Sequence, residues 1–130
     1  MIYRALHKND AEAISPLILG FCKETGATEA ERDGLIDRIR TGTIRGVIAE
    51  NGSICGIAGY SPQGGIAVGE FVYVVPEKRG ILGGALFNRA CKQAKEEQNC
   101  KMVILASTKN SGRYKRRGYS TKYEVLEKEL

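Results

Sequence analysis

The 130-residue chain contains no tryptophan and a single histidine, His7. None of its cysteines forms a Cys-x-x-Cys pair, and with one histidine beside them the common zinc-ligand patterns are excluded. No apolar run approaches the roughly 20 residues of a membrane-spanning helix, and the first ten residues lack the apolar segment of a signal peptide. We therefore expect a cytoplasmic protein without a metal or a membrane partner. We expect reduced thiols at Cys22, Cys55, Cys91 and Cys100.

The chain does have a surplus of positive charge. Twenty Lys and Arg residues stand against 15 Asp and Glu, which gives a net charge of +5 and a pI near 9.1. The sequences EKR at 77–79 and KRR at 115–117 flank two glycine-marked segments. Such a balance favours an anionic partner, for example a nucleic acid or a phosphorylated small molecule. A solvated surface is the ordinary explanation of a short basic run, so charge alone does not decide the function.

The apolar pattern predicts one domain over residues 1–130. Strands are predicted over 2–7, 46–50, 53–60, 66–75, 101–107 and 121–130. Helices are predicted over 11–24, 28–41, 82–97 and 109–117. Turns are predicted at Asn51-Gly52, a pair suited to a two-residue hairpin turn, and at residues 61–65. This order predicts an α+β fold with a mixed, mainly antiparallel sheet flanked by helices.

Two helix starts carry capping signals. The first helix begins either after Asp10 or with Ser15-Pro16 as N-cap and first helical residue. Thr28 followed by Glu31 has the spacing of a capping box, which predicts that the second helix begins there.

The segment VVPEKRGILGGAL, residues 74–86, joins a nearly continuous apolar strand to an amphipathic helix. We call residues 79–84 the glycine turn. Glycine lowers helix stability by about 0.8–1.0 kcal/mol relative to alanine, so Gly83 and Gly84 at a helix entrance need an explanation. Free amides and the helix dipole at that position attract anions, and glycine lets a phosphate approach the backbone. A tight turn that needs glycine only for packing is the alternative, and the sequence has neither a Walker loop nor a GxGxxG fingerprint.

Two segments resemble a known family. PEKRGILGGAL resembles the acyl-CoA-binding segment of the GNAT superfamily of N-acetyltransferases, whose pattern is [QR]xxGx[GA] after a strand that ends near a proline. RYKRRGY at 113–119 resembles the family's closing tyrosine-x-x-x-glycine-aromatic segment, in the short form of compact, phage- or prophage-type members. The chain departs from the pattern at two places. Leu82 replaces the first motif glycine, and Asn110 precedes Tyr114 by only four residues.

The resemblance implies acetyl-CoA as cosubstrate and an acyl-CoA N-acyltransferase fold. The pyrophosphate would lie on the glycine turn, and pantetheine would lie along residues 72–74, where the strand splays from the strand over 101–107. The cofactor-binding residues implied in this way are Val72, Tyr73, Val74, Arg79, Gly80, Ile81, Leu82, Gly83, Gly84 and Asn110.

Direct acetyl transfer to an amine in a ternary complex needs a base, an oxyanion donor and an acid. A base is required because an amine of pKa about 10.4 is neutral in only about one molecule per thousand at pH 7. We expect Glu70 as the base, since it is a carboxylate in an apolar strand and alternation puts it on the face of Val72 and Val74. The Val74 amide would stabilise the oxyanion, and Tyr114 would protonate the leaving thiolate. The alternatives for the base are Glu50, Glu77 and a water chain.

The acceptor is left open by the sequence, as a small-molecule or protein amine bound by the two N-terminal helices and the 61–65 turn. Four acidic residues of helix 28–41 would either attract a cationic amine or form a solvated face. Two other functions stay open. One is a catalytically idle acyl-CoA-binding protein, supported by the two departures from the motif. The other is a basic nucleic-acid-binding module, which the sequence disfavours because no recognisable nucleic-acid-binding motif is present. Related folds often dimerise, so a homodimer is also expected.

Overall fold

In the computed structural model, residues 1–98, 101–105, 108–121 and 126–129 are described, and of residues 98 and 108–110 only the backbone. The described strands form one sheet in the order β1-β2-β3-β4-β5. They are β1 (Ile2–Ala5), β2 (Arg45–Asn51), β3 (Ser53–Gln63), β4 (Ile66–Val74) and β5 (Lys101–Val103). The first four pair antiparallel and β5 pairs parallel to β4. The predicted mixed, mainly antiparallel sheet is confirmed.

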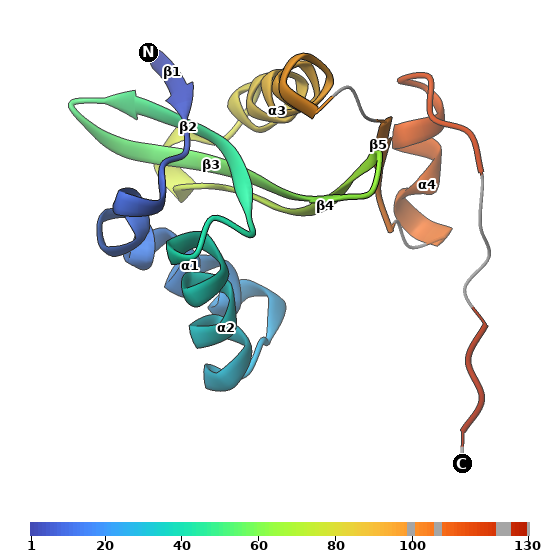
Figure 1. Cartoon of the computed structure of the whole chain (residues 1–130), viewed down its shortest axis with the longest axis horizontal. Helices are drawn as coiled ribbons and strands as arrows, with labels where there is room; N and C mark the ends of the chain where they lie inside the picture. Colours follow the sequence, from blue (N-terminus) through green and yellow to red (C-terminus); the bar gives the residue numbers. More distant parts are fainter. Residues whose placement is uncertain (99–100, 106–107, 122–125, 130) are drawn as a thin grey trace.

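Helices cover both faces of this sheet (Figure 1). Helices α1 (Ala11–Thr25) and α2 (Glu29–Arg40) lie against one face, and α3 (Leu82–Gln98) lies against the other. Helix α4 (Thr108–Lys115) lies beyond β5, at the end of the sheet (Figure 1). Two short 3-10 turns, η1 (Lys8–Asp10) and η2 (Pro76–Lys78), precede α1 and α3. Within the described part of the chain, no helix has both the length and the apolar character needed to cross a bilayer.

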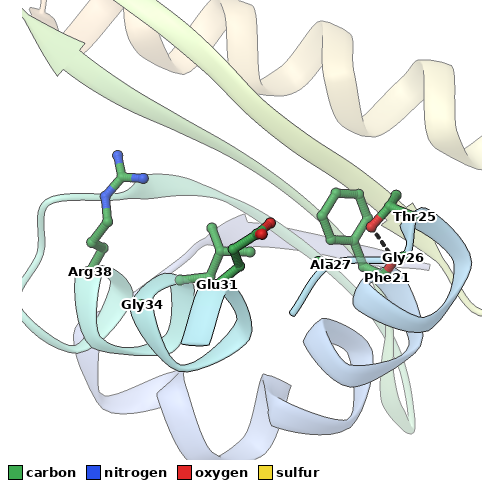
Figure 2. Close-up of a pocket in the computed structure, with 8 residues that line it drawn as sticks. Phe21, Thr25, Gly26, Ala27, Glu31, Gly34 and Arg38 are labelled. Carbon is green, nitrogen blue, oxygen red and sulfur yellow. Dashed lines mark hydrogen bonds between the residues drawn. The ribbon is translucent and has the colours of Figure 1, made fainter. Parts of the chain in front are cut away.

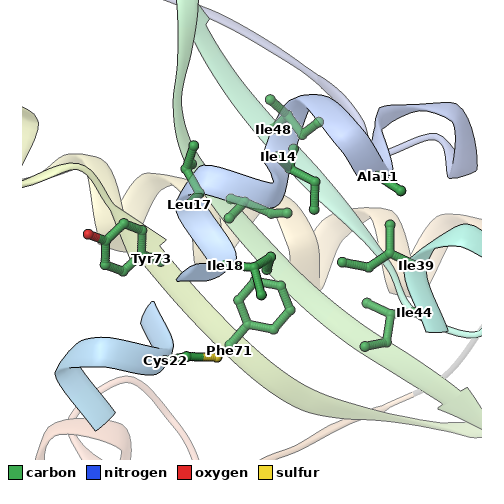
Figure 3. Packing of buried hydrophobic residues seen from close by; sticks show 11 residues of the cluster. Ala11, Ile14, Leu17, Ile18, Cys22, Ile39, Ile44, Ile48, Phe71 and Tyr73 are labelled. Carbon is green, nitrogen blue, oxygen red and sulfur yellow. The ribbon is translucent and has the colours of Figure 1, made fainter. Parts of the chain in front are cut away.

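Each face of the sheet has its own buried core. On the α1 and α2 face, Ile14 and Ile18 of α1 and Ile39 of α2 are fully buried in one cluster with Phe71 and Tyr73 of β4 (Figure 3). On the α3 face, the four-residue spacing seen in the sequence buries one stripe of the helix against β2, β3 and β4. Its members are Leu82, Leu86, Ala90 and Ala94. The register of β4 therefore decides which of its residues reach which helix.

The two predicted helix starts can be compared with the structure. Helix α1 begins at Ala11 and runs through Pro16, so the alternative start at Ser15-Pro16 is wrong. The Asp10 side chain does not cap α1, because it accepts hydrogen bonds from the Arg4 guanidinium and the His7 amide instead. At α2 the Thr28 hydroxyl accepts the Glu31 amide at 3.1 Å, as the capping signal predicted.

Two turns of the structure differ in detail from their predictions. Gly52, with φ of 79°, turns the β2–β3 hairpin as expected, but Asn51 still pairs opposite Ser53. The turn predicted over 61–65 is shorter, because β3 continues through Gln63 and only Gly64 and Gly65 turn, both with positive φ.

The C-terminal strands were predicted too long. The buried strand expected over 101–107 is the three-residue edge strand β5, and Leu105 is 80% exposed. Met102 and Val103 are only half-buried, because within the described chain β5 pairs on one side alone. Residues 126–129 form no strand, while 106–107, 122–125 and 130 of the predicted strands lie outside the described residues.

Candidate active site

A β-bulge in β4 defines the centre of the candidate site. Gly59 pairs with Phe71 and the next residue of β3, Tyr60, pairs with Gly69. Glu70 is therefore an extra residue of β4 with no partner position in β3, as in a bulge. A bulge bends the strand that carries it, so β4 changes direction at this residue.

After its pairing with β5 ends, β4 has no strand partner on that side among the described residues; we call residues 69–74 the open edge. The parallel pairing with β5 covers Ile66 to Val68 only. The Val75 amide donates to the Cys55 carbonyl at 2.9 Å. This bond shows that the backbone groups of Val75, and of every second residue before it as far as the bulge, point toward β3. Because inward and outward groups alternate along an antiparallel strand, the amides of Val72 and Val74 point to the open edge. The strand separation expected between 72–74 and 101–107 is thus present, as far as these strands are described.

The glycine turn follows directly after β4. Gly80 has φ of 140°, a value that favours glycine. Helix α3 begins with a hydrogen bond from the Ala85 amide to the Ile81 carbonyl, so the amides of its first residues have no partner within the helix. Leu82, which replaces the motif glycine, is 7% exposed and packs into the α3 core. The substitution therefore adds core packing, while the backbone amide of Leu82 stays at the helix entrance.

Packing does not explain the two glycines that open α3. A Cβ at Gly83 would come no closer than 4.0 Å to Val74 Cγ2, and one at Gly84 would lie 3.4 Å from Arg117 Nη2, the end of a flexible side chain. By contrast, a Cβ at Gly56 in β3 would lie 2.6 Å from Leu86 Cδ1. Among the described atoms, both positions thus leave room over the backbone, and a group such as a phosphate could approach it closely there.

The positive charge beside Gly84 comes from Arg117. The Arg79 guanidinium is held by β4 and α1: its Nε donates to the Val74 carbonyl at 2.9 Å, and its Nη2 pairs with Glu24 of α1 at 2.5 Å. The hydrogen bond to Glu24 raises the pKa of Arg79, and the guanidinium also lies 5.3 Å from the centre of the Tyr73 ring. Arg117, from the basic run after α4, is the guanidinium that lies against Gly84.

Glu70 faces α2. Its Oε1 accepts hydrogen bonds from Arg38 Nη2 at 2.6 Å and from the buried Ser61 hydroxyl at 2.7 Å. Val74, by contrast, belongs to the α3 core. The expectation that alternation places Glu70 on the face of Val72 and Val74 is therefore wrong, because the bulge interrupts the two-residue period. Arg38 and Ser61 were not predicted, since Arg38 lies 32 residues from Glu70 and nothing local in the sequence indicates the pair.

Tyr114 belongs to an aromatic cluster between α3 and α4. Its ring centre lies 6.2 Å from that of Phe87 and 5.6 Å from that of Tyr119. The Tyr119 amide donates to the Tyr114 carbonyl and Gly118 has φ of 93°, so the tyrosine-x-x-x-glycine-aromatic segment closes the end of α4. Asn110 lies in α4, but its side chain lies outside the described residues.

The thiol of Cys91 lies beside this aromatic cluster. The Cys91 sulfur and the Tyr119 hydroxyl are 3.4 Å apart, and burial raises the pKa of both groups. Of the four cysteines, Cys22 and Cys55 are buried free thiols and Cys91 is a half-buried one, while Cys100 lies outside the described residues.

A pocket of about 470 Å³ separates α1 from α2 (Figure 2). Its lining residues come from the C-terminal end of α1, the α1–α2 connection and α2. They are Phe21, Thr25, Gly26, Ala27, Glu31, Gly34, Leu35 and Arg38. Arg38 links this pocket to the bulge, because its guanidinium pairs with Glu70. The two helices expected to bind the acceptor thus enclose a pocket, whereas the 61–65 turn does not line it.

The architecture matches solved acetyltransferases along nearly the whole chain. A GCN5-related N-acetyltransferase from Ralstonia eutropha superposes with a TM-score of 0.72 at 22% identity, covering 98% of this chain and 97% of that one. A Trypanosoma brucei acetyltransferase gives a TM-score of 0.65 at 26% identity, covering 99% of both chains. A predicted acetyltransferase from Clostridium acetobutylicum, solved with acetyl-CoA, gives 0.72 at 20% identity, covering 99% of this chain and 96% of that one. A search among curated proteins found no match.

These likenesses define the fold class as that of the acyl-CoA acyltransferases with a mixed sheet between two helical layers. The family itself follows from the sequence. The model of the acetyltransferase (GNAT) family matches residues 12–119, and the chain belongs to that family.

Proposed function

We propose that the protein is an acetyl-CoA-dependent N-acetyltransferase that joins acetyl-CoA and a primary amine in a ternary complex. The observation that carries this proposal is the open edge of β4 leading directly into the glycine turn. An extended, amide-containing ligand can pair with the outward backbone groups of a free strand edge, and its phosphates can continue onto the α3 amides. Acetyl-CoA has both parts in that order.

In this proposal the cofactor site has two regions. Val72, Tyr73 and Val74 supply the strand that pairs with the pantetheine amides. The residues of the glycine turn, Arg79 to Gly84, supply the backbone that holds the pyrophosphate. Arg117 adds the nearby positive charge, and Arg79 acts indirectly, because it fixes the end of β4 to α1 through Val74 and Glu24. Asn110 remains a proposed contact in α4.

The proposed chemistry uses three groups. The amine nitrogen attacks the thioester carbonyl carbon, and its proton passes to Glu70, whose Oε1 is held by Arg38 and Ser61. The outward amide of Val74 donates to the oxyanion that forms. When the carbon–sulfur bond breaks, the Tyr114 hydroxyl gives its proton to the CoA thiolate. The products are the N-acetylated amine and CoA.

Calorimetric titration with acetyl-CoA tests the cofactor site. Gly84→Glu places a bulky anion beside the α3 amides and should abolish saturable one-to-one binding. Ala13→Glu is the matched control, because it adds the same charge at an exposed position of α1. Loss of binding in both variants, or no binding of either acetyl-CoA or CoA to the wild type at millimolar concentration, would overturn the proposal.

Release of the CoA thiol with a panel of primary amines then tests turnover. An N-acetyltransferase should release thiol only with an acceptor present, and Tyr114→Phe should slow the release. Tight acetyl-CoA binding without turnover on any amine would instead indicate the idle acyl-CoA-binding protein.

A further inference from the structure

The acidic residues of α2 differ in whether they are neutralised. Glu29 and Asp33 both pair with Arg32, and Asp37 pairs with Arg40. Glu31 contacts only the neutral Thr28 hydroxyl, and no basic side chain of the described residues pairs with it. Among the described residues, Glu31 is therefore the one carboxylate of α2 without an ion pair.

That carboxylate lines the α1–α2 pocket. Figure 2 shows Glu31 directed toward the gap in which Phe21 of α1 lies. The other charged lining residue, Arg38, is neutralised by Glu70, so Glu31 supplies the net charge of the lining. The remaining lining residues are mostly apolar or small, with Phe21, Ala27 and Leu35 among them. The lining thus combines a carboxylate without an ion pair, apolar walls, and Arg38, which reaches the proposed base.

We propose that the acceptor is an aliphatic diamine, with one ammonium held by Glu31 while the other amine is acetylated beside Glu70. This inference rests on the proposed function and names its substrate class. Glu31 and Arg38 are seven residues apart on α2, which corresponds to roughly 10 Å along the helix axis. A chain of several methylene groups spans such a distance and suits the apolar walls. A protein with net charge +5 repels a dication at long range, so the local carboxylate is what selects it.

The amine beside Glu70 reacts by the same bond and proton changes as in the proposed function. The neutral amine forms the new carbon–nitrogen bond, the thioester carbon–sulfur bond breaks, and one proton leaves the amine while the CoA thiolate gains one. The ammonium at Glu31 takes no part in these steps. It orients the chain, so Glu31 is a specificity residue.

The test compares hexamethylenediamine with hexylamine, which have the same chain length but differ in the second charge. The wild type should show a several-fold higher kcat/KM for the diamine. In Glu31→Gln the kcat/KM ratio of diamine to hexylamine should fall to about one, because the charged contact is lost, while the acetyl-CoA affinity stays unchanged. Glu29→Gln is the matched control, since Glu29 is exposed and pairs with Arg32, and it should keep the preference. Calorimetry of hexamethylenediamine with the CoA-saturated protein gives a second readout that does not depend on turnover.

The outcomes distinguish failure of the proposed function from failure of the diamine inference. Absence of acetyl-CoA binding to the wild type would refute the proposed function. If acetyl-CoA binds but the diamine neither binds nor reacts, or if the diamine preference is equal in the wild type and Glu31→Gln, the diamine inference is refuted alone. Equal losses in Glu31→Gln and Glu29→Gln would also refute it, because they would indicate a general charge effect.

Discussion

Replacing Gly84 should separate stability from cofactor binding. Among the described atoms, only the end of the Arg117 side chain would lie within 4 Å of a Cβ added at Gly84, with Nη2 at 3.4 Å. Alanine and leucine are both good helix formers, so Gly84→Ala and Gly84→Leu should each raise the free energy of unfolding by about 0.5–1 kcal/mol. In a protein of this size that gain corresponds to a Tm increase of roughly 2–6 °C.

The two variants should differ in acetyl-CoA affinity. The motif accepts glycine or alanine here, so Gly84→Ala should bind within a few-fold of the wild type. The leucine side chain would cover the amides, and loss of two hydrogen bonds to a charged group, at about 1.5–3 kcal/mol each, weakens binding more than 100-fold. Urea unfolding and calorimetry measure the two quantities.

Gly34 provides the control for this experiment. It also lies in a helix, and a Cβ there would meet no atom of the described residues within 4 Å. Gly34→Leu should therefore stabilise α2 and leave acetyl-CoA affinity unchanged. Wild-type affinity in Gly84→Leu would refute the assignment of the glycine turn to phosphate binding. A lower unfolding free energy in that variant would refute the claim that the space is free of protein atoms.

Three further predictions follow from other parts of the molecule. Gly56→Ala should lower the unfolding free energy by about 1–3 kcal/mol, because the new Cβ would lie 2.6 Å from Leu86 Cδ1; an unchanged urea midpoint would show that Leu86 moves at little cost. Tyr114→Phe should lower kcat by about 100-fold or more and keep the Tm near that of the wild type, since its ring contacts remain; an unchanged kcat in the thiol-release assay would exclude Tyr114 as the acid. Hydrogen bonding to Arg4 lowers the pKa of Asp10. The ionised carboxylate therefore stabilises the fold at pH values above the ordinary Asp pKa of about 3.9. This stabilisation is lost as the pH falls through the lowered pKa. Urea unfolding from pH 5 to pH 2 should therefore show a steeper loss of stability in the wild type than in Asp10→Asn, and equal slopes would contradict the pairing.

The elements that the sequence predicted well are those with local causes. The four-residue apolar spacing located α3, the capping pair at Thr28 located α2, and Gly52 located the first hairpin turn. Each of these signals depends on residues within one or two turns of each other. Neighbouring residues determine such features almost regardless of the remaining fold.

The features that were missed depend on contacts between distant segments. The bulge at Glu70 exists only in relation to the register of β3, so alternation along β4 alone placed the carboxylate on the wrong face. Arg79 matches the motif by position, yet its guanidinium pairs with Glu24, 55 residues away. The pairing of Arg38 with Glu70 has the same origin. The residues that the motifs name were thus predictable, whereas the directions of their side chains were not.

The bulge has a consequence for how this chain can gain or lose chemistry. Gly59 already pairs with Phe71 and Tyr60 with Gly69, so deletion of Glu70 would leave both pairings in phase. Ala67 would keep its place in the α3 core and Phe71 its place against α1. The strand would lose its bend and its carboxylate, but every core position would survive. With Glu70 as the proposed base, fold and chemistry would be separable by a single codon, a short evolutionary path between an active enzyme and a silent copy of the same scaffold.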